Sequence, residues 1–339
     1  MKSVALFAAL FGITAGAVAA DAAKPAKEFK IAMIAKSSTN PVFLSGRAGA
    51  EFAAGELSKK YAAELAKMNY SKIVIDWRTP PNEDAQLQAQ RIAQSVNDGV
   101  DAILLSCSDA GKVNGAINDA VARDIPVFTF DSDAPQSKRF AFYGVDDIET
   151  GRQTMSEMAK AIDGKGKVAI LSGSQNAPNL KKRVEGAQTE AKKYPGIEIV
   201  GVFNCVETPQ DAAAEVVRVT NAHPEITAWA MVGGWPLFTK TLLKDIDSNK
   251  IKIVSVDALP AQLPYIEKGL TPTLLAQSCF LWGSIGVEKI VDKVILKKDV
   301  PVMNKQELVV VNKDTLGKWA RQLKEWKFDD VPEEYLKLP

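Results

Sequence analysis

The sequence contains very few of the side chains that bind metals or act as nucleophile-activating bases. Its 339 residues include one histidine, His223, and three cysteines, Cys107, Cys205 and Cys279. Zinc sites use cysteine and histidine at short spacing, and these residues are scattered. A Ser-His-Asp hydrolase would depend on His223, whose neighbours (221–224) are typical of a helix end. We therefore expect no metal site and no catalytic activity.

The chain also lacks an excess of either charge. It has 42 Lys and Arg residues against 41 Asp and Glu residues, which gives a net charge of +1. Proteins that bind nucleic acids usually carry a basic excess, so we expect no nucleic-acid partner. The hydrophobic (46%) and charged (24%) fractions are those of a globular protein and not of a disordered one.

Glycine-rich phosphate-binding motifs are missing as well. No G-x-G-x-x-G follows the first predicted strand, and G-x-x-x-x-G-K-[ST] does not occur in the chain. Both motifs let the backbone approach a phosphate closely, and their absence argues against a nucleotide-dependent dehydrogenase or a P-loop protein. We expect no cofactor.

The first twenty residues have the pattern of a secretory signal peptide. Lys2 provides a basic start, Val4 to Val18 is apolar and uncharged, and 17–20 offers small residues for cleavage. No later stretch is long and apolar enough to span a bilayer, and no cysteine near the cleavage position offers a lipid anchor. We predict that residues 1–20 are removed and that the mature protein is exported to the periplasm. The alternative is a buried N-terminal helix.

After the linker that follows, short apolar runs alternate with longer amphipathic segments. We predict strands over 29–34, 73–77, 102–105, 125–130, 168–171, 197–203, 226–231 and 251–256. We predict helices over 43–67, 84–98, 113–123, 179–193, 212–222, 236–247 and 281–296. Continuous apolar runs indicate strands buried on both faces, and the alternation indicates βαβ units with parallel sheets. The series starts again at residue 168, so we predict two α/β halves.

The last part of the chain does not start a third unit. Residues 273–311 are predicted to hold a strand, a helix and another strand, which is typical of a chain that crosses back between two lobes. We interpret the polar segment 326–339 as an extension packed against the body of the protein. Export would permit disulfides, but three cysteines leave at least one unpaired. We expect free, buried thiols, although Cys107 and Cys279 both follow predicted strands and can lie near each other.

Polar and aromatic residues gather just after the predicted strands, where open parallel sheets bind their ligands. Asp131 and Asp257 each end an apolar strand, and they lie in different halves of the chain. Carboxylates and amides match the donors and acceptors of sugar hydroxyls, and aromatic faces cover the apolar face of a sugar ring. We therefore predict a carbohydrate site. The candidate residues are Lys36, Asn40, Phe43, Ser106, Asp131, Asp133, Trp235, Asp257 and Gln277.

Several candidates have a structural alternative that the sequence leaves open. Ser106 and Asp133 can cap the helices that follow them, Trp235 can be a packing residue, and Lys36 can be a solvated lysine at a strand end. Paired carboxylates can also carry glycosidase chemistry. However, the two strand-end acids lie in binding loops of separate halves, and no acid stands in a clearly apolar pocket.

The order and spacing of several segments resembles the ribose-type periplasmic binding proteins, the solute receptors of sugar ABC importers. The resemblance covers about residues 28–312. It is carried by 31–36 and 40–43, by 99–103, by 125–133, by Arg183 with 185–186, by Asp257, and by Gln277 with Gly283 and 286–288.

The resemblance implies an α/β fold of two Rossmann-like lobes with parallel sheets, joined by three hinge crossings and closing on a ligand. On this basis we place residues 28–145 and 278–305 in an N-terminal lobe. Residues 146–277 and 306–339 then form a C-terminal lobe.

The resemblance also implies roles for individual residues. Asn40 and Phe43 should touch the ligand, Asp131 and Asp257 match paired acids that hold hydroxyls, and Arg183 matches a ligand-facing arginine. The same comparison makes Gln277 a hinge glutamine. We add Asn179, the first residue of a predicted helix, to the ligand-binding set.

This chain departs from the ribose receptors at three positions. Ser132 stands where they carry an arginine, Gly233 where they carry an asparagine, and Val42 replaces one of two stacked phenylalanines. Lys36 and the run 130–133 look more like the branch that binds rhamnose-type sugars and the furanosyl autoinducer. These changes argue against ribose itself.

Taken together, these features predict a monomeric periplasmic receptor. Its ligand would be a pentose, hexose, deoxysugar or related polyol, and its partner the permease of an ABC importer. A chemoreceptor partner stays open. The alternative function is a signalling receptor for a furanosyl autoinducer or a chemotaxis ligand. A LacI-type repressor shares the core but needs a DNA-binding headpiece where this chain has the signal-peptide pattern.

Overall fold

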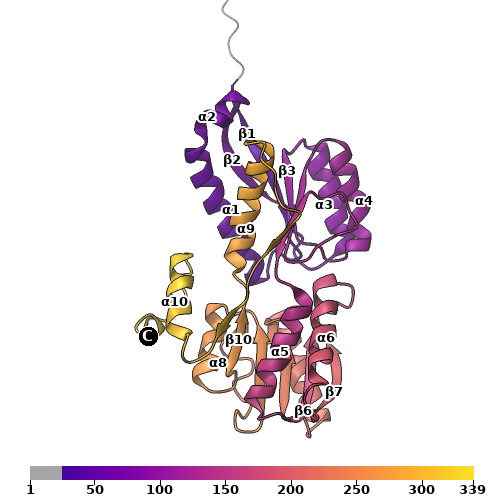
Figure 1. Cartoon of the computed structure of the whole chain (residues 1–339), viewed down its shortest axis with the longest axis vertical. Coiled ribbons are helices and arrows are strands. Elements are labelled where there is room, and N and C mark those ends of the chain that lie inside the picture. Colours follow the sequence, from indigo (N-terminus) through magenta and orange to yellow (C-terminus); the bar gives the residue numbers. More distant parts are fainter. Residues whose placement is uncertain (1–24) are drawn as a thin grey trace, which may run out of the picture.

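The computed structural model describes residues 25–339, so the predicted signal peptide, 1–20, lies outside the described residues. These residues form two lobes, one above the other in Figure 1, each built on a six-stranded sheet with helices on both faces. None of the helices in this range is long and apolar enough to cross a membrane.

The N-terminal lobe contains the sheet with strand order β11-β5-β4-β3-β1-β2, and every pairing in it is parallel. Its elements are β1 (Lys27–Ile34), α1 (Pro41–Lys60), α2 (Ala62–Lys67), β2 (Tyr70–Trp77), α3 (Ala85–Asn97), β3 (Ala102–Leu105), α4 (Ala110–Ala122), β4 (Val127–Phe130), β5 (Ala141–Gly144), α9 (Cys279–Val294) and β11 (Met303–Lys305).

The C-terminal lobe repeats this plan with strand order β12-β10-β9-β8-β6-β7, in which only β12 runs antiparallel. Its elements are α5 (Asp147–Ala161), β6 (Lys165–Ser172), α6 (Pro178–Ala191), β7 (Gly196–Asn204), α7 (Pro209–Ala222), β8 (Ala228–Met231), a 3₁₀ turn (Trp235–Leu237), β9 (Lys252–Val256), a second 3₁₀ turn (Pro260–Gln262), α8 (Leu263–Glu267), β10 (Thr273–Ala276), β12 (Val309–Val311), α10 (Leu316–Glu325) and α11 (Glu333–Leu336).

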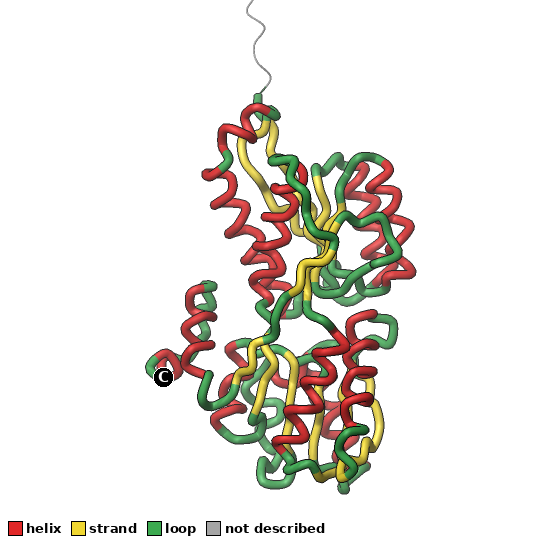
Figure 2. Tube along the Cα trace, viewed as in Figure 1, coloured by secondary structure: helices red, strands yellow, loops and turns green. Residues whose placement is uncertain are grey.

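The chain passes between the two sheets three times, after β5, after β10 and between β11 and β12. Figure 2 shows these crossings running together between the lobes. The predicted fold class is therefore confirmed. The lobe boundaries at 145/146, 277/278 and 305/306 remain a proposal, placed at these crossings.

The central strands are buried along their whole length. Every residue of β3, β4, β8 and β10 is buried, because helices cover both faces of each sheet. This explains why these segments are continuous apolar runs in the sequence and do not alternate with polar residues.

Several helices begin where a side chain accepts a hydrogen bond from one of the first free backbone N–H groups. Asn40 caps α1 directly before Pro41, and Asp84, Asp109 and Asp146 cap α3, α4 and α5 in the same way. Each cap follows a strand end, so it also fixes the loop that faces the other lobe.

One pair of helices in each lobe packs unusually closely at glycines. In the N-terminal lobe, a Cβ at Gly49 of α1 would collide with the carbonyl of Phe280 in α9, and one at Gly283 of α9 would collide with the carbonyl of Gly46. In the C-terminal lobe, a Cβ at Gly151 of α5 would collide with the backbone of α6. Figure 1 shows both pairs side by side.

The C-terminal extension packs against the C-terminal lobe. Helix α10 lies on the C-terminal lobe, where the Trp319 indole donates a hydrogen bond to the Ala258 carbonyl (2.7 Å) and Tyr335 donates one to Glu267 (2.9 Å). At the end of α10, the half-buried ring of Trp326 stacks on Phe280 of the other lobe, with centroids 5.7 Å apart and planes inclined by 4°. The extension thus bridges the two lobes beside the hinge.

Some predicted elements differ from the structure. The predicted helix 236–247 is wrong: the segment forms only the short 3₁₀ turn and irregular turns. Gly233 and Gly234 precede Trp235 and Pro236, which favours a turn at this place. Leu237 and Leu243 are both buried in the core. The predicted helix 43–67 is divided at Tyr61 into α1 and α2.

The three cysteines are free, as expected. Cys107 and Cys279 are buried, whereas Cys205 is only partly buried.

Candidate functional site

The two predicted acids occupy equivalent strand ends in the two lobes. Asp131 follows β4 and Asp257 follows β9, and both adopt the left-handed backbone conformation (φ 57° and 71°). The Asp131 amide donates to the Tyr143 carbonyl (3.1 Å) and the Asp257 amide to the Leu275 carbonyl (2.9 Å), each on the next strand of its sheet. Left-handed aspartates cost backbone energy, and such residues cluster at ligand sites.

Asp131 is the centre of a polar network that joins the lobes. Ser106, after β3, donates to one carboxylate oxygen (2.7 Å), and the Lys36 ammonium lies 3.6 Å from the same oxygen. Asn179 on α6 of the other lobe donates to the second oxygen (3.3 Å) and accepts a hydrogen bond from Lys36 (3.1 Å). These four predicted residues therefore meet in one cluster across the cleft.

Arg183 extends this network within the C-terminal lobe. Its guanidinium donates to Asp147 (2.9 Å), to the carbonyl of Val232 (3.1 Å) and to Gln277 (2.9 Å). One of its nitrogens lies 4.0 Å from a carboxylate oxygen of Asp131. Arg183 is thus held by its own lobe while it faces the acid of the other lobe.

Asp257 is tied to the same arginine through Gln277. The Gln277 amide donates to one Asp257 oxygen (2.9 Å), and the backbone N–H of Gly234 donates to the other (3.3 Å). Burial raises the pKa of Asp257, and the Gln277 hydrogen bond opposes that rise. The chain from Asp131 through Arg183 and Gln277 to Asp257 runs from one strand end to its equivalent.

The charges of the network are almost entirely shielded from water. The exposed fractions are 3% for Lys36, 4% for Asp131, 2% for Arg183 and 5% for Asp257. Burial acts to lower the pKa of Lys36, but the neighbouring Asp131 carboxylate and other acids raise it overall. Buried charges of this kind need partners, and here they provide each other with oriented donors and acceptors. Such an array can bind a neutral solute rich in hydroxyl groups.

Asn40 and Phe43 lie at the start of α1, and Trp235 lies in the turn after β8. Asn40 accepts a hydrogen bond from the Val42 amide (3.1 Å), so it caps a helix as well as facing the cleft. Phe43 packs against Trp282 with centroids 6.0 Å apart. Trp235, in the turn after β8, is 4% exposed. Asn40 and Phe43 line a cavity of about 310 Å³ between the lobes, whose wall also contains Ser174 and Glu207.

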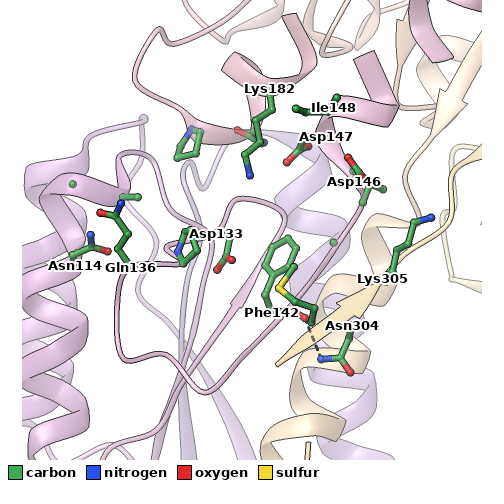
Figure 3. A pocket seen from close by; sticks show the side chains of 18 residues that line it. Asn114, Asp133, Gln136, Phe142, Asp146, Asp147, Ile148, Lys182, Asn304 and Lys305 are labelled. Atoms are coloured by element: carbon green, nitrogen blue, oxygen red, sulfur yellow. Dashed lines mark hydrogen bonds between the residues drawn. The ribbon is translucent and has the colours of Figure 1, made fainter. Parts of the chain in front are cut away.

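Asp133 is not brought into the Asp131 cluster. Both of its carboxylate oxygens bind the Arg139 guanidinium (2.6 and 2.7 Å), and Thr129 donates to one of them (2.6 Å). The side chain faces a different cavity of about 780 Å³. Figure 3 shows this cavity, with Lys182 and Asp147 of the C-terminal lobe opposite Asp133 and Phe142. The interactions of Asp133 are those of a structural ion pair.

Some residues of the cleft were not predicted from the sequence. Asp147 was not found because the short strand before it, β5, was not predicted. Gln88 of α3 donates to the carbonyls of Ala35 (3.1 Å) and Ser106 (2.7 Å) and so holds two strand ends together. A helical glutamine gives no sequence signal of this kind. Glu83 lies in a loop after a strand, where the strand-end rule could have found it.

Within residues 25–339, no group of three His, Cys, Asp or Glu side chains is arranged to hold a metal ion.

Comparisons with known proteins agree with this geometry. The sequence profile of the family described as "Periplasmic binding protein domain" matches residues 31–298. The ribose import binding protein of Bacillus subtilis is 28% identical over 202 residues, which is 60% of this chain and 61% of that protein. The matched stretch therefore spans about three fifths of this curated relative.

Two solved structures extend the similarity over both lobes. A solute-binding protein of an ABC transporter from Burkholderia graminis, solved with D-arabinose, is 26% identical, has a TM-score of 0.76 and is matched over 86% of this chain and 98% of its own. A protein solved as the XylFII–LytSN complex is 27% identical, with a TM-score of 0.74 over 84% of this chain and 98% of its own.

Proposed function

Because the chain belongs to the family of the periplasmic binding protein domain, we propose that it is a periplasmic receptor that binds a monosaccharide or related polyol between its lobes. Members of this family are solute receptors and not enzymes. The observation that carries the proposal is the cross-lobe network, in which Asp131 and Asp257 stand at equivalent strand ends and are joined through Arg183 and Gln277.

The chemistry of the network suits a neutral sugar. A hydroxyl both donates and accepts, so it can satisfy a carboxylate and an amide or ammonium group at the same time. A charge-assisted hydrogen bond contributes ~1.5–3 kcal/mol net. A few such bonds, less the entropy lost on binding, give about −8 kcal/mol, which is micromolar affinity. Phe43 and Trp235 offer the aromatic surfaces for the apolar face of the ring.

Binding couples to closure of the lobes. Lys36 and Asp131 belong to the N-terminal lobe, whereas Asn179 and Arg183 belong to the C-terminal lobe. A sugar whose hydroxyls replace the direct bonds between these groups contacts both lobes only when the cleft is closed. It therefore shifts the population toward the closed form, which the permease of an ABC importer would recognise.

The remaining parts of the proposal follow from the family and the sequence. The protein would be exported after removal of residues 1–20, act as a monomer in the periplasm and use no cofactor. Residues 28–145 with 278–305 would move against 146–277 with 306–339. The sugar would be a pentose, hexose or deoxysugar other than ribose, given Ser132 and Gly233.

A signalling role is the second candidate. It is favoured by the buried Lys36, which reaches Asn179 across the cleft and resembles the lysine of receptors for the furanosyl autoinducer. The similarity to a protein solved in the XylFII–LytSN complex also supports a partner other than a permease.

A thermal-shift screen of the mature protein tests both candidates. The panel contains pentoses including D-arabinose, hexoses, deoxysugars, polyols and the autoinducer. A ligand at about a hundred times its Kd adds about 2.7 kcal/mol to stability. A shift with one sugar class supports uptake, a shift with the autoinducer alone supports signalling, and a flat screen contradicts both.

A further inference from the structure

Two carboxyl groups from different lobes meet at the cavity of about 310 Å³. Glu83 lies in the loop between β2 and α3, and Glu207 lies in the loop between β7 and α7. Both line the cavity, together with Phe43 and Ser174. Neither acid belongs to the sugar network around Asp131.

Few hydrogen-bond donors are available to Glu83 and Glu207. One Glu207 oxygen accepts a hydrogen bond from the Ser174 amide (2.9 Å). Glu83 lines the same cavity as Glu207, and its buried Oε1 atom has no hydrogen-bond partner among the described residues. Two carboxylates are both acceptors, so they can bond to each other only through a shared proton.

The charged groups that face Glu83 come from three loops. Lys36 follows β1, Asp131 follows β4 and Glu207 follows β7. The Cys205 thiol also lines the cavity. Lys36 is the cation of this set, but its ammonium is already engaged with Asp131 and Asn179. It therefore relieves the repulsion between the two glutamates only in part.

We propose that Glu83 and Glu207 form a proton-dependent clasp between the lobes. A proton shared by the two carboxyl groups holds the cleft closed, and loss of that proton leaves two facing anions that drive the lobes apart. This device acts on the conformational equilibrium itself and does not depend on which solute fills the cleft.

The direction of the pH effect follows from the two states. In the closed arrangement, burial and the neighbouring Glu207 raise the pKa of Glu83 from 4.5 to about 8, against the opposing effect of Lys36. In an open cleft, water reaches the group and its pKa returns toward the ordinary value. Closure therefore takes up a proton. It is fully favoured at low pH, and its equilibrium constant falls by about tenfold per pH unit between the two pKa values.

Small-angle X-ray scattering of the sugar-free protein at pH 5.5 and pH 8.5 tests the clasp. We expect the radius of gyration of the wild type to increase at the higher pH. In Glu207→Gln the amide can donate to Glu83 at either pH, so the radius should stay at the compact value. Glu83→Gln should behave in the same way. The control is Glu185→Gln, an exposed glutamate of α6, which should keep the wild-type response.

Titration of the glutamate carboxyl carbons by NMR provides a second measurement if a variant folds poorly. One glutamate of the wild type should titrate well above the others. A wild-type radius that is equal at both pH values, or a pH response that persists in Glu207→Gln, overturns the proposal. Because no sugar is present, a flat sugar screen leaves this result unaffected.

Discussion

Asp131 and Asp257 occupy equivalent positions in two repeated folding units. Each follows the fourth strand of its lobe, each has a positive φ (57° and 71°), and each donates its amide to the neighbouring strand. Parallel sheets present their strand ends at one edge. The two edges face each other across the hinge, so the carboxylates of both lobes reach one polar network. We expect the two acids to contribute similarly to solute binding.

Replacing either acid with asparagine should weaken sugar binding about 10- to 100-fold. Asparagine tolerates the left-handed backbone and keeps the volume, so the change removes the charge with little strain. The estimate is the ~1.5–3 kcal/mol of a charge-assisted hydrogen bond. Calorimetric titration of Asp131→Asn and Asp257→Asn with the sugar found by the screen measures it. Asp245→Asn, at an exposed position, is the control. Unchanged affinity in both variants would place the solute elsewhere.

Asp133→Asn should lower stability and leave sugar affinity near the wild-type value. The side chains of Asp133 and Arg139 are 12% and 5% exposed, and removing one charge leaves the other buried without an ionic partner. Breaking such a buried pair costs about 3–5 kcal/mol. Urea unfolding and a titration below the unfolding temperature separate the two effects. A large loss of affinity with normal stability would restore Asp133 to the binding site.

Gly49→Ala and Gly55→Ala should change stability in opposite directions although both lie on α1. The added methyl at position 49 meets the carbonyl of Phe280 and must push α9 away, which costs about 1–3 kcal/mol. At position 55 no heavy atom lies within 4 Å of the added Cβ, so no clash opposes the higher helix propensity of alanine. The free energy of unfolding should rise by about 0.5–1 kcal/mol. Thermal unfolding of both variants checks the sign. Equal effects would contradict the close crossing of α1 and α9.

Trp326→Ala should shift the sugar-free protein toward more open arrangements of the two lobes. The Trp326–Phe280 stack joins the C-terminal extension to the other lobe, and an aromatic pair contributes ~0.5–1.5 kcal/mol beyond its buried area. We expect a larger radius of gyration for the sugar-free protein and up to about tenfold weaker sugar binding. Trp326→Phe keeps a ring for stacking and should recover most of both properties. If the alanine variant has the wild-type radius, the stack does not restrain opening.

The fold was predictable because the buried strands are continuous apolar runs. β3 was predicted with its observed bounds, 102–105, and β1, β4 and β9 within two residues at each end. The missed strands, β5 and β11, have only four and three residues, too few for a recognisable apolar run, and β11 is also a largely exposed edge strand. The predicted helix 236–247 failed because its apolar residues pack into the core as irregular turns.

The candidate site was partly predictable for a related reason. Polar residues directly after a predicted strand, such as Asp131 and Asp257, can be placed at the sheet edge from the sequence alone. Glu83 and Glu207 also follow strands, but their pairing could not be predicted because it depends on which loops of distant segments meet. Gln88 lies within a helix and gives no such signal. Asp133 shows the limit of the rule, since its strand-end position gives no information about Arg139.

The three crossings also determine when the molecule can fold. The N-terminal lobe needs α9 and β11, residues 279–305, to cover α1 and complete its sheet, and the C-terminal lobe needs β12, residues 309–311. Neither lobe is therefore complete until nearly the whole chain has left the ribosome. A nascent chain that ends before residue 279 lacks α9, so the apolar face of α1 that packs on α9 stays uncovered and we expect the N-terminal lobe not to reach its stable fold. We therefore expect the two lobes to complete their folding together, late in synthesis, and not in order from the N-terminus.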